Sequence, residues 1–179
     1  MTLDSERPLR LLLVADHLDA RGSADLSIDL ARHLKTRGHR ILVLHHGGPR
    51  VEELRRAGID RITLPLPRHQ RSAIDDFSPD LIHSLSLSAI SPALPLVRQL
   101  ERPFLLTVHG WPRDRSNRLD LQGIRPAAVI AVSDIVREHL VNRADVAWDQ
   151  VQVVEGAVDI RRLQAHPPEI DSPHAPVVG

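Results

Sequence analysis

Histidines recur at one kind of position in this sequence, at or just beyond the end of a short apolar run. Five of the 11 histidines share it, namely His17, His45, His46, His83 and His109. A neutral imidazole offers one hydrogen-bond donor and one acceptor, which suits contacts with sugar hydroxyls or phosphates. His109 is the principal candidate, because the apolar run that starts at Phe104 stops abruptly at this histidine and at Gly110. The alternative interpretation is that polar residues simply begin where strands end.

Two glycine-containing segments permit close approach of a ligand to the backbone. The first, Asp16–Ser23, joins a predicted strand to a predicted helix, where backbone amides bind phosphate in nucleotide-binding folds. Gly22 and Ser23 would be the contacts, although neither the dinucleotide fingerprint nor the P-loop pattern is present, and Ser23 as an ordinary helix N-cap is the alternative. The second, His45–Pro49, contains Gly47-Gly48, which is typical of a turn. Its two adjacent histidines would point to opposite faces of a strand, so at most one is expected in the site.

The composition excludes several classes of site. Cysteine and the His-Glu-x-x-His pattern are both absent, so we predict no metal site, and no motif indicates a cofactor. The formal net charge of 0 argues against broad capture of nucleic acid. Four arginines follow Trp111 in one polar stretch: Arg113, Arg115, Arg118 and Arg125. Such a stretch is either a solvated surface loop or a contact for an anionic acceptor or a membrane surface.

Short apolar runs alternate with amphipathic segments along most of the chain. Strands are predicted at Leu9–Ala15, Arg40–His45, Ile62–Leu64, Leu81–His83, Phe104–Val108, Ala128–Val132 and Val151–Val154. Helices are predicted at Ser23–Arg37, Val51–Ala57, Ser91–Leu100 and from the cap Ser133 to Asn142. This order predicts an α/β fold, a doubly wound, mainly parallel Rossmann-like sheet with helices on both faces. Ligands collect beyond the carboxyl ends of the strands in such sheets, where the five histidines fall.

The composition changes near residue 165. We predict a Rossmann-like domain over residues 1–164 and a proline-rich linker over 165–179, because four prolines interrupt any regular element there. The final residues, Ala175–Gly179, resemble the first strand of a further domain. The sequence shows no signal segment at its start and no apolar run of membrane length. We therefore expect a cytoplasmic protein, with the inner face of the membrane as the alternative location.

Several motifs, in their order and spacing, resemble those of a known enzyme family. They are Ala31–His39, Pro79–His83, Thr107–Gly110, Ala128–Ser133 and Val153–Asp159. From about Leu9 to Leu163 the chain is similar to the N-terminal, acceptor-binding domain of retaining glycosyltransferases of the GT-B fold, in the family numbered four. The resemblance implies an enzyme of two Rossmann-like domains, in which the second binds the nucleotide-sugar and the reaction occurs in the cleft between them.

The resemblance also implies roles for individual residues. His109 matches the histidine that lies near the transferred sugar, and Gly22, with Ser23, matches the loop that faces the donor diphosphate. Further candidates for acceptor or substrate contacts are His83, His17, Gly110 and Ser133. The first loop departs from the family pattern of two glycines, an acidic residue and an arginine, since this chain has Gly22-Ser23-Ala24-Asp25.

These observations predict the acceptor-binding half of a glycosyltransferase, which transfers a sugar from a nucleotide-sugar to a sugar, polyol or lipid-linked acceptor. The donor-binding C-terminal domain is expected to be missing from this chain, so the isolated domain is expected to be inactive. We also predict peripheral contact with a membrane and no nucleic-acid partner. The alternative is a stand-alone, non-catalytic carbohydrate- or polyol-binding module of the same fold, and an epimerase of the same two-domain architecture also remains open.

Overall fold

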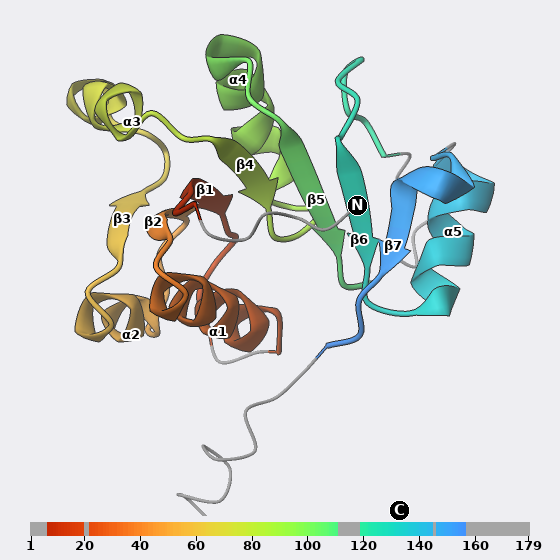
Figure 1. The fold of residues 1–179 in the computed structure, drawn as a ribbon, viewed down its shortest axis with the longest axis horizontal. Coiled ribbons are helices and arrows are strands. Elements are labelled where there is room, and N and C mark those ends of the chain that lie inside the picture. The colour runs from red at the N-terminus through yellow and green to blue at the C-terminus, as the bar shows by residue number, and fades with distance from the viewer. Residues whose placement is uncertain (1–6, 20–21, 111–118, 145, 157–179) are drawn as a thin grey trace, which may run out of the picture.

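The computed structural model describes residues 7–19, 22–110, 119–144 and 146–156, which fold around one parallel sheet (Figure 1). Its strands are β1 (Arg10–Val14), β2 (Arg40–His45), β3 (Asp60–Thr63), β4 (Leu81–Ser84), β5 (Phe104–Val108), β6 (Ala128–Ala131) and β7 (Val151–Val153). The helices are α1 (Gly22–Thr36), α2 (Val51–Arg56), α3 (Arg71–Phe77), α4 (Ile90–Leu100) and α5 (Asp134–Ala144), with short 3-10 helices η1 (Arg68–Gln70) and η2 (Trp148–Gln150). The strand order is β3-β2-β1-β4-β5-β6-β7. This order confirms the predicted doubly wound Rossmann-like sheet.

Apolar side chains on both faces of the sheet hold its layers together. In β1, Leu12 and Val14 belong to one buried cluster, whereas Leu11 and Leu13 belong to the other. The first cluster includes residues of α3, α4 and α5, and the second includes residues of α1 and α2. Figure 1 shows α1 and α2 on the opposite side of the sheet from α3 and α4. Burial on both faces explains why the strands appear in the sequence as continuous apolar runs.

The two ends of α1 differ in how well the sequence predicted them. Gly38 ends the helix as predicted, with φ at +89° and with the N–H of His39 donating to the Leu34 carbonyl at 3.2 Å. At the other end, the prediction of Ser23 as N-cap is wrong. The helix begins at Gly22, so Ser23 already lies in the first turn, and an N-cap must precede the first helical residue.

The direction in which strands are added reverses between β1 and β4. β1 lies between β2 and β4, and its last residue, Val14, pairs with Leu44 on one side and Ser84 on the other. The connections that follow β1 and β4 lead to opposite faces of the sheet, since α1 and α4 pack in different clusters. In doubly wound sheets, this reversal marks where ligands bind, outside the carboxyl ends of the strands.

Two elements differ from the sequence prediction. The helix α3 was not predicted, because only Ile74 and Phe77 of its seven residues are buried and so short a segment carries no clear periodicity. The strand β3 begins at Asp60, two residues before the predicted Ile62, because the ladder with β2 pairs Leu42 with Asp60. Hydrogen bonding to the neighbouring strand determines where β3 begins, and the pattern of apolar residues in the sequence does not predict this pairing.

Candidate functional site

His109 lies just beyond the carboxyl end of β5 and is bonded to the neighbouring strand connection. Its Nε2 is 2.9 Å from the carbonyl oxygen of Leu85, the residue that directly follows β4. Because a carbonyl only accepts, Nε2 carries the proton, and Nδ1 of the neutral ring is an acceptor. This Nδ1 is buried and has no hydrogen-bond partner among the described residues. His109 therefore keeps one unused acceptor at the carboxyl edge of the sheet.

A second hydrogen bond joins the same two strands deeper in the sheet. His83 Nε2 and Thr107 Oγ1 are 2.7 Å apart, and the two residues are only 7% and 8% exposed. The register pairs His83 with Leu105, so Thr107 and His109 follow at successive alternate positions of β5 and its extension. Alternate residues of a strand share one face of the sheet. The structure thus brings together two of the predicted histidines and a threonine that the sequence analysis did not single out.

Burial keeps these two histidines neutral. Desolvation, followed by the proximity of His109, lowers the pKa of His83 to about 4. Desolvation also lowers the pKa of His109, although its hydrogen bond to the Leu85 carbonyl opposes this shift. At neutral pH both rings are therefore uncharged hydrogen-bonding groups, which favours contacts with hydroxyls over the binding of anions by charge.

A separate pair of histidines follows β1 and β2. The ring centroids of His17 and His46 are 5.6 Å apart, with His17 exposed and His46 half-buried. His45, by contrast, is 1% exposed, and its Nδ1 accepts the Gly47 N–H at 2.9 Å. Burial first, and then Arg61, lowers the pKa of His45. The adjacent His45 and His46 thus differ in environment. Of the two, His46 lies beside His17, another of the five histidines predicted at strand ends.

The other predicted contacts lie at helix starts. Ser133 caps α5, because its Oγ accepts the Val136 N–H at 3.3 Å, which confirms its predicted structural role. Gly22 and Ser23 form the start of α1, and the Ser23 carbonyl accepts the hydroxyl of Ser27 at 2.7 Å. The Ser23 side chain is exposed. These residues lie at the carboxyl edge of the sheet, but their contacts here are those of helix ends.

The structural constraint on the side chain differs between Gly48 and Gly110. At Gly48, φ is +123° and a Cβ atom would lie 2.3 Å from the carbonyl oxygen of Leu18. The close approach at Gly47-Gly48 is thus to the chain's own first loop. At Gly110 a Cβ atom would meet nothing within 4 Å among the described residues. A side chain at position 110 would therefore clash with none of the described residues.

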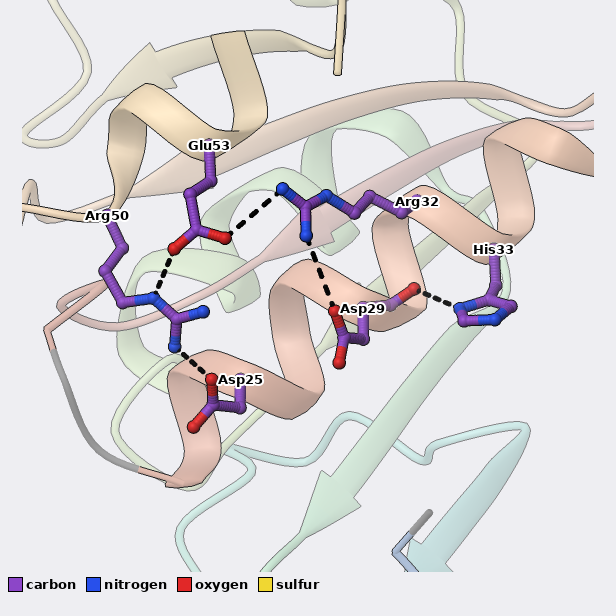
Figure 2. Close-up of polar contacts among 6 residues, drawn as sticks. All are labelled: Asp25, Asp29, Arg32, His33, Arg50 and Glu53. Carbon is purple, nitrogen blue, oxygen red and sulfur yellow. Dashed lines mark hydrogen bonds and ion pairs between the residues drawn. The ribbon is translucent and has the colours of Figure 1, made fainter. Parts of the chain in front are cut away.

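A network of ion pairs joins α1 to the start of α2, and the sequence analysis missed it (Figure 2). Arg50 pairs with Asp25 and, at 2.6 Å, with Glu53. Arg32 bonds Glu53 at 3.2 Å and lies 3.7 Å from Asp29. Charged residues 25 positions apart, such as Asp25 and Arg50, give no local signal of pairing. Only the packing of α1 against the segment that begins α2 brings them together.

Two features of the described residues bear on metal binding and on membrane spanning. Its His, Cys, Asp and Glu residues form no group of three that could hold a metal ion. None of its helices combines the length and the apolarity needed to cross a bilayer. Of the four arginines considered for an anionic surface, Arg125 is exposed, whereas Arg113, Arg115 and Arg118 lie outside the described residues. The predicted linker over 165–179 lies outside them as well.

The strand order and the carboxyl edge define the class of protein, a Rossmann-like α/β domain of the kind found in GT-B glycosyltransferases. A sequence profile of Glycosyltransferase Family 4 matches residues 20–162. The chain therefore belongs to glycosyltransferase family 4, which confirms the predicted family. A comparison with curated proteins gives no significant match.

Solved structures show the same fold at low sequence identity. Anabaena Alr3699/HepE in complex with UDP is 17% identical with a TM-score of 0.70, and the match covers 84% of this chain and 45% of that chain. A glycosyltransferase from Rickettsia africae is 22% identical with a TM-score of 0.63, covering 87% of this chain and 46% of that one. CalG4, the calicheamicin glycosyltransferase, is 15% identical with a TM-score of 0.57, covering 85% and 54%. The chain thus spans about half the length of these structures, consistent with an N-terminal domain.

Proposed function

We propose that this chain is the acceptor-binding half of a retaining glycosyltransferase, which transfers a sugar from a nucleotide-sugar to a sugar, polyol or lipid-linked acceptor. Family membership supports the reaction class, and the solved complexes of Anabaena Alr3699/HepE with UDP and with UDP-glucose support a nucleotide-sugar donor. The observation that carries the proposal is the unused acceptor of His109, held at the carboxyl edge of the sheet by the Leu85 carbonyl.

His109 positions a hydroxyl and does not act as a nucleophile. With its proton on Nε2, the ring keeps Nδ1 as an acceptor for a sugar O–H, and the lowered pKa keeps this nitrogen unprotonated. Because Nδ1 is buried, the sugar must displace the atoms that cover it. A fixed acceptor of this kind contributes through orientation and electrostatic stabilisation at the reaction centre. The His83–Thr107 hydrogen bond joins β4 to β5 and so stabilises the position of the His109 ring, two residues after Thr107.

The remaining candidates are assigned to other positions along the carboxyl edge. Gly22 and Ser23 face the donor diphosphate, and His83, His17, Gly110 and Ser133 contribute to the acceptor or substrate side. We place the reaction in the cytoplasm, at or near the inner face of the membrane, where the exposed Arg125 would meet anionic headgroups. The donor-binding half would come from a second domain.

Titration of the ¹⁵N-labelled chain tests the proposal. Glucose and myo-inositol, as hydroxyl-bearing probes, should shift the amide signals of Leu85 and Gly110, and His109→Ala should weaken this binding by about tenfold, the effect of one lost hydrogen bond in a buried site. His33→Ala is the matched control, because His33 is exposed and bonds only its own helix at Asp29. Equal binding by parent and His109→Ala would refute the assignment, and so would tight binding of UDP-glucose by this chain alone.

One observation favours the alternative of a non-catalytic polyol-binding module. Asp25 places a carboxylate in the first turn of α1, beside the residues that would face a diphosphate. A carboxylate there weakens the attraction of the helix start for an anionic ligand, and its pair with Arg50 offsets part of this effect. Polyol-induced shifts at Gly110, with no shift of Gly22 or Ser23 at any UDP-glucose concentration, would favour this module over the transferase.

A further inference from the structure

We propose that Arg50 is a positioning residue of the candidate site, which ties the loop after β1 to the first turn of α1 and thereby sets where Gly22 and Ser23 lie. The inference rests on the proposed function, in which these two residues face the donor diphosphate. It assigns a site role to a residue of the loop after β2, apart from His83 and His109.

Main-chain contacts join the loops that follow β1 and β2. The Leu18 N–H donates to the Gly47 carbonyl at 2.7 Å, and the Arg50 N–H donates to the Leu18 carbonyl at 3.1 Å. Between these bonds, Gly48 lies so close to Leu18 that no larger residue fits without a backbone shift. The two loops are thus held as one unit, with Leu18 enclosed by the turn before α2.

The side chain of Arg50 extends this unit to α1. It is 14% exposed and pairs with Asp25, which lies in the first turn of α1 (Figure 2). Arg50 therefore bonds Leu18 before the helix through its main chain and Asp25 inside the helix through its side chain. A guanidinium with several donors in a fixed plane suits this role, because it can bond two carboxylates at once.

Its carboxylate partners keep Arg50 charged and oriented. The hydrogen bond to Glu53, aided by Asp25, raises the pKa of Arg50 against the opposing effect of burial. Glu53 is held in turn by Arg32 of α1 at 3.2 Å. Arg50 also balances the charge of Asp25, which would otherwise stand uncompensated near Gly22 and repel a diphosphate. Loss of Arg50 should therefore affect both the geometry and the charge of the start of α1.

Two measurements on the ¹⁵N-labelled chain test this role. In Arg50→Gln the main-chain bond to Leu18 remains, but the side-chain bonds that hold Arg50 to Asp25 and Glu53 are lost, so we expect the Leu18 amide to exchange about tenfold faster. UDP is the ligand probe, and its weak binding, followed at the Gly22 and Ser23 amides, should weaken about fivefold or more. Arg50→Lys should restore part of both effects, since it keeps the charge but not the planar fork.

Arg55→Gln is the matched control, because Arg55 lies on α2 close to the network but its side chain bonds Glu52, which is not part of the network. It should leave both measurements unchanged. Equal Leu18 exchange and UDP affinity in parent and Arg50→Gln would overturn the inference, and so would equal effects of Arg55→Gln. If UDP shifts neither Gly22 nor Ser23 in the parent chain, the proposed donor contact fails and the inference with it. UDP shifts in the parent that survive in Arg50→Gln refute the inference alone.

Discussion

The carboxyl edge of the sheet holds two regions that are built differently. At the carboxyl ends of β4 and β5, neutral and largely buried groups form hydrogen bonds: His83 with Thr107 inside the strands, and His109 with the Leu85 carbonyl just beyond them. Beyond β1 and β2, close main-chain contacts are reinforced by ion pairs, with Arg50 at their centre. The hydrogen bonds near His83 and His109 depend on a low local dielectric and on which ring nitrogen carries the proton. The contacts around Arg50 depend on close backbone packing and on charge.

The difference shows how one sheet edge can serve two tasks. Neutral hydrogen-bonding groups in a buried setting discriminate hydroxyls by geometry, because any unpaired group there carries a desolvation cost. Ion pairs with exposed members are individually weak, but they hold loop segments whose main-chain bonds alone are few. The two regions should therefore respond to different perturbations, and three measurements on the free energy of unfolding separate them.

Gly48→Ala should have the largest effect, in the first-loop region. The new methyl group would lie 2.3 Å from the Leu18 carbonyl oxygen, in a backbone conformation that disfavours a side chain. We expect a loss of about 3 kcal/mol in urea denaturation. Gly47→Ala is the matched control: its φ is +94°, but nothing described lies within 4 Å, so we expect about 1 kcal/mol. Equal losses at the two positions would show that the close approach to Leu18 is not what constrains this turn.

Acid should act next, on the histidine region. Because the pKa of His83 is about 4 when folded and near its ordinary 6.5 when unfolded, the unfolded chain binds more protons between these values. Stability is complete above about pH 6.5 and falls as the pH decreases, with a loss of about 2 kcal/mol by pH 5. Urea denaturation across this pH range measures the slope. His83→Gln should remove this share of the slope and leave the smaller shares of His45 and His109, whose pKa values burial also lowers. A slope unchanged in this variant would place the pH dependence elsewhere.

Salt should have the smallest effect, confined to the ion pairs. We expect Arg50→Gln to lower the free energy of unfolding by about 1 kcal/mol, less than a fully buried pair because Asp25 is exposed. The loss should shrink in about 1 M NaCl, where charges are screened within a few ångströms. Arg55→Gln is the control, since its pair with Glu52 is exposed, and it should change stability by no measurable amount. A salt-independent loss would mean that Arg50 acts by packing alone.

The local elements could be predicted from the sequence where a strong pattern exists. Continuous apolar runs located the strands, and Gly38 and Ser133 marked a helix end and a helix start correctly. The pattern failed where elements are short or where neighbours decide. The helix α3 has only two buried residues, and Ser23 lies inside α1 because the chain is already helical at Gly22.

The candidate site could be predicted in part. The clustering of histidines at strand ends was visible, because strand ends are local features. Their division into one pair at the ends of β4 and β5, His83 and His109, and a second pair after β1 and β2, His17 and His46, was not visible, since it depends on which strands are neighbours. Thr107 and Arg50 were missed for the same reason, because each acts through a partner distant in sequence.

By itself, the sequence determined the alternation of strands and helices, the family, and the residues that stand at the carboxyl ends of strands. These follow from local periodicity and from short motifs, which need no knowledge of distant partners. Tertiary structure alone decided the strand order, the proton position on His109, and the double attachment of Arg50 to Leu18 and Asp25. The physical reason is that burial and hydrogen-bond partners are properties of packed neighbours, and these neighbours are 24 to 32 positions apart in the chain in the contacts that shape this site.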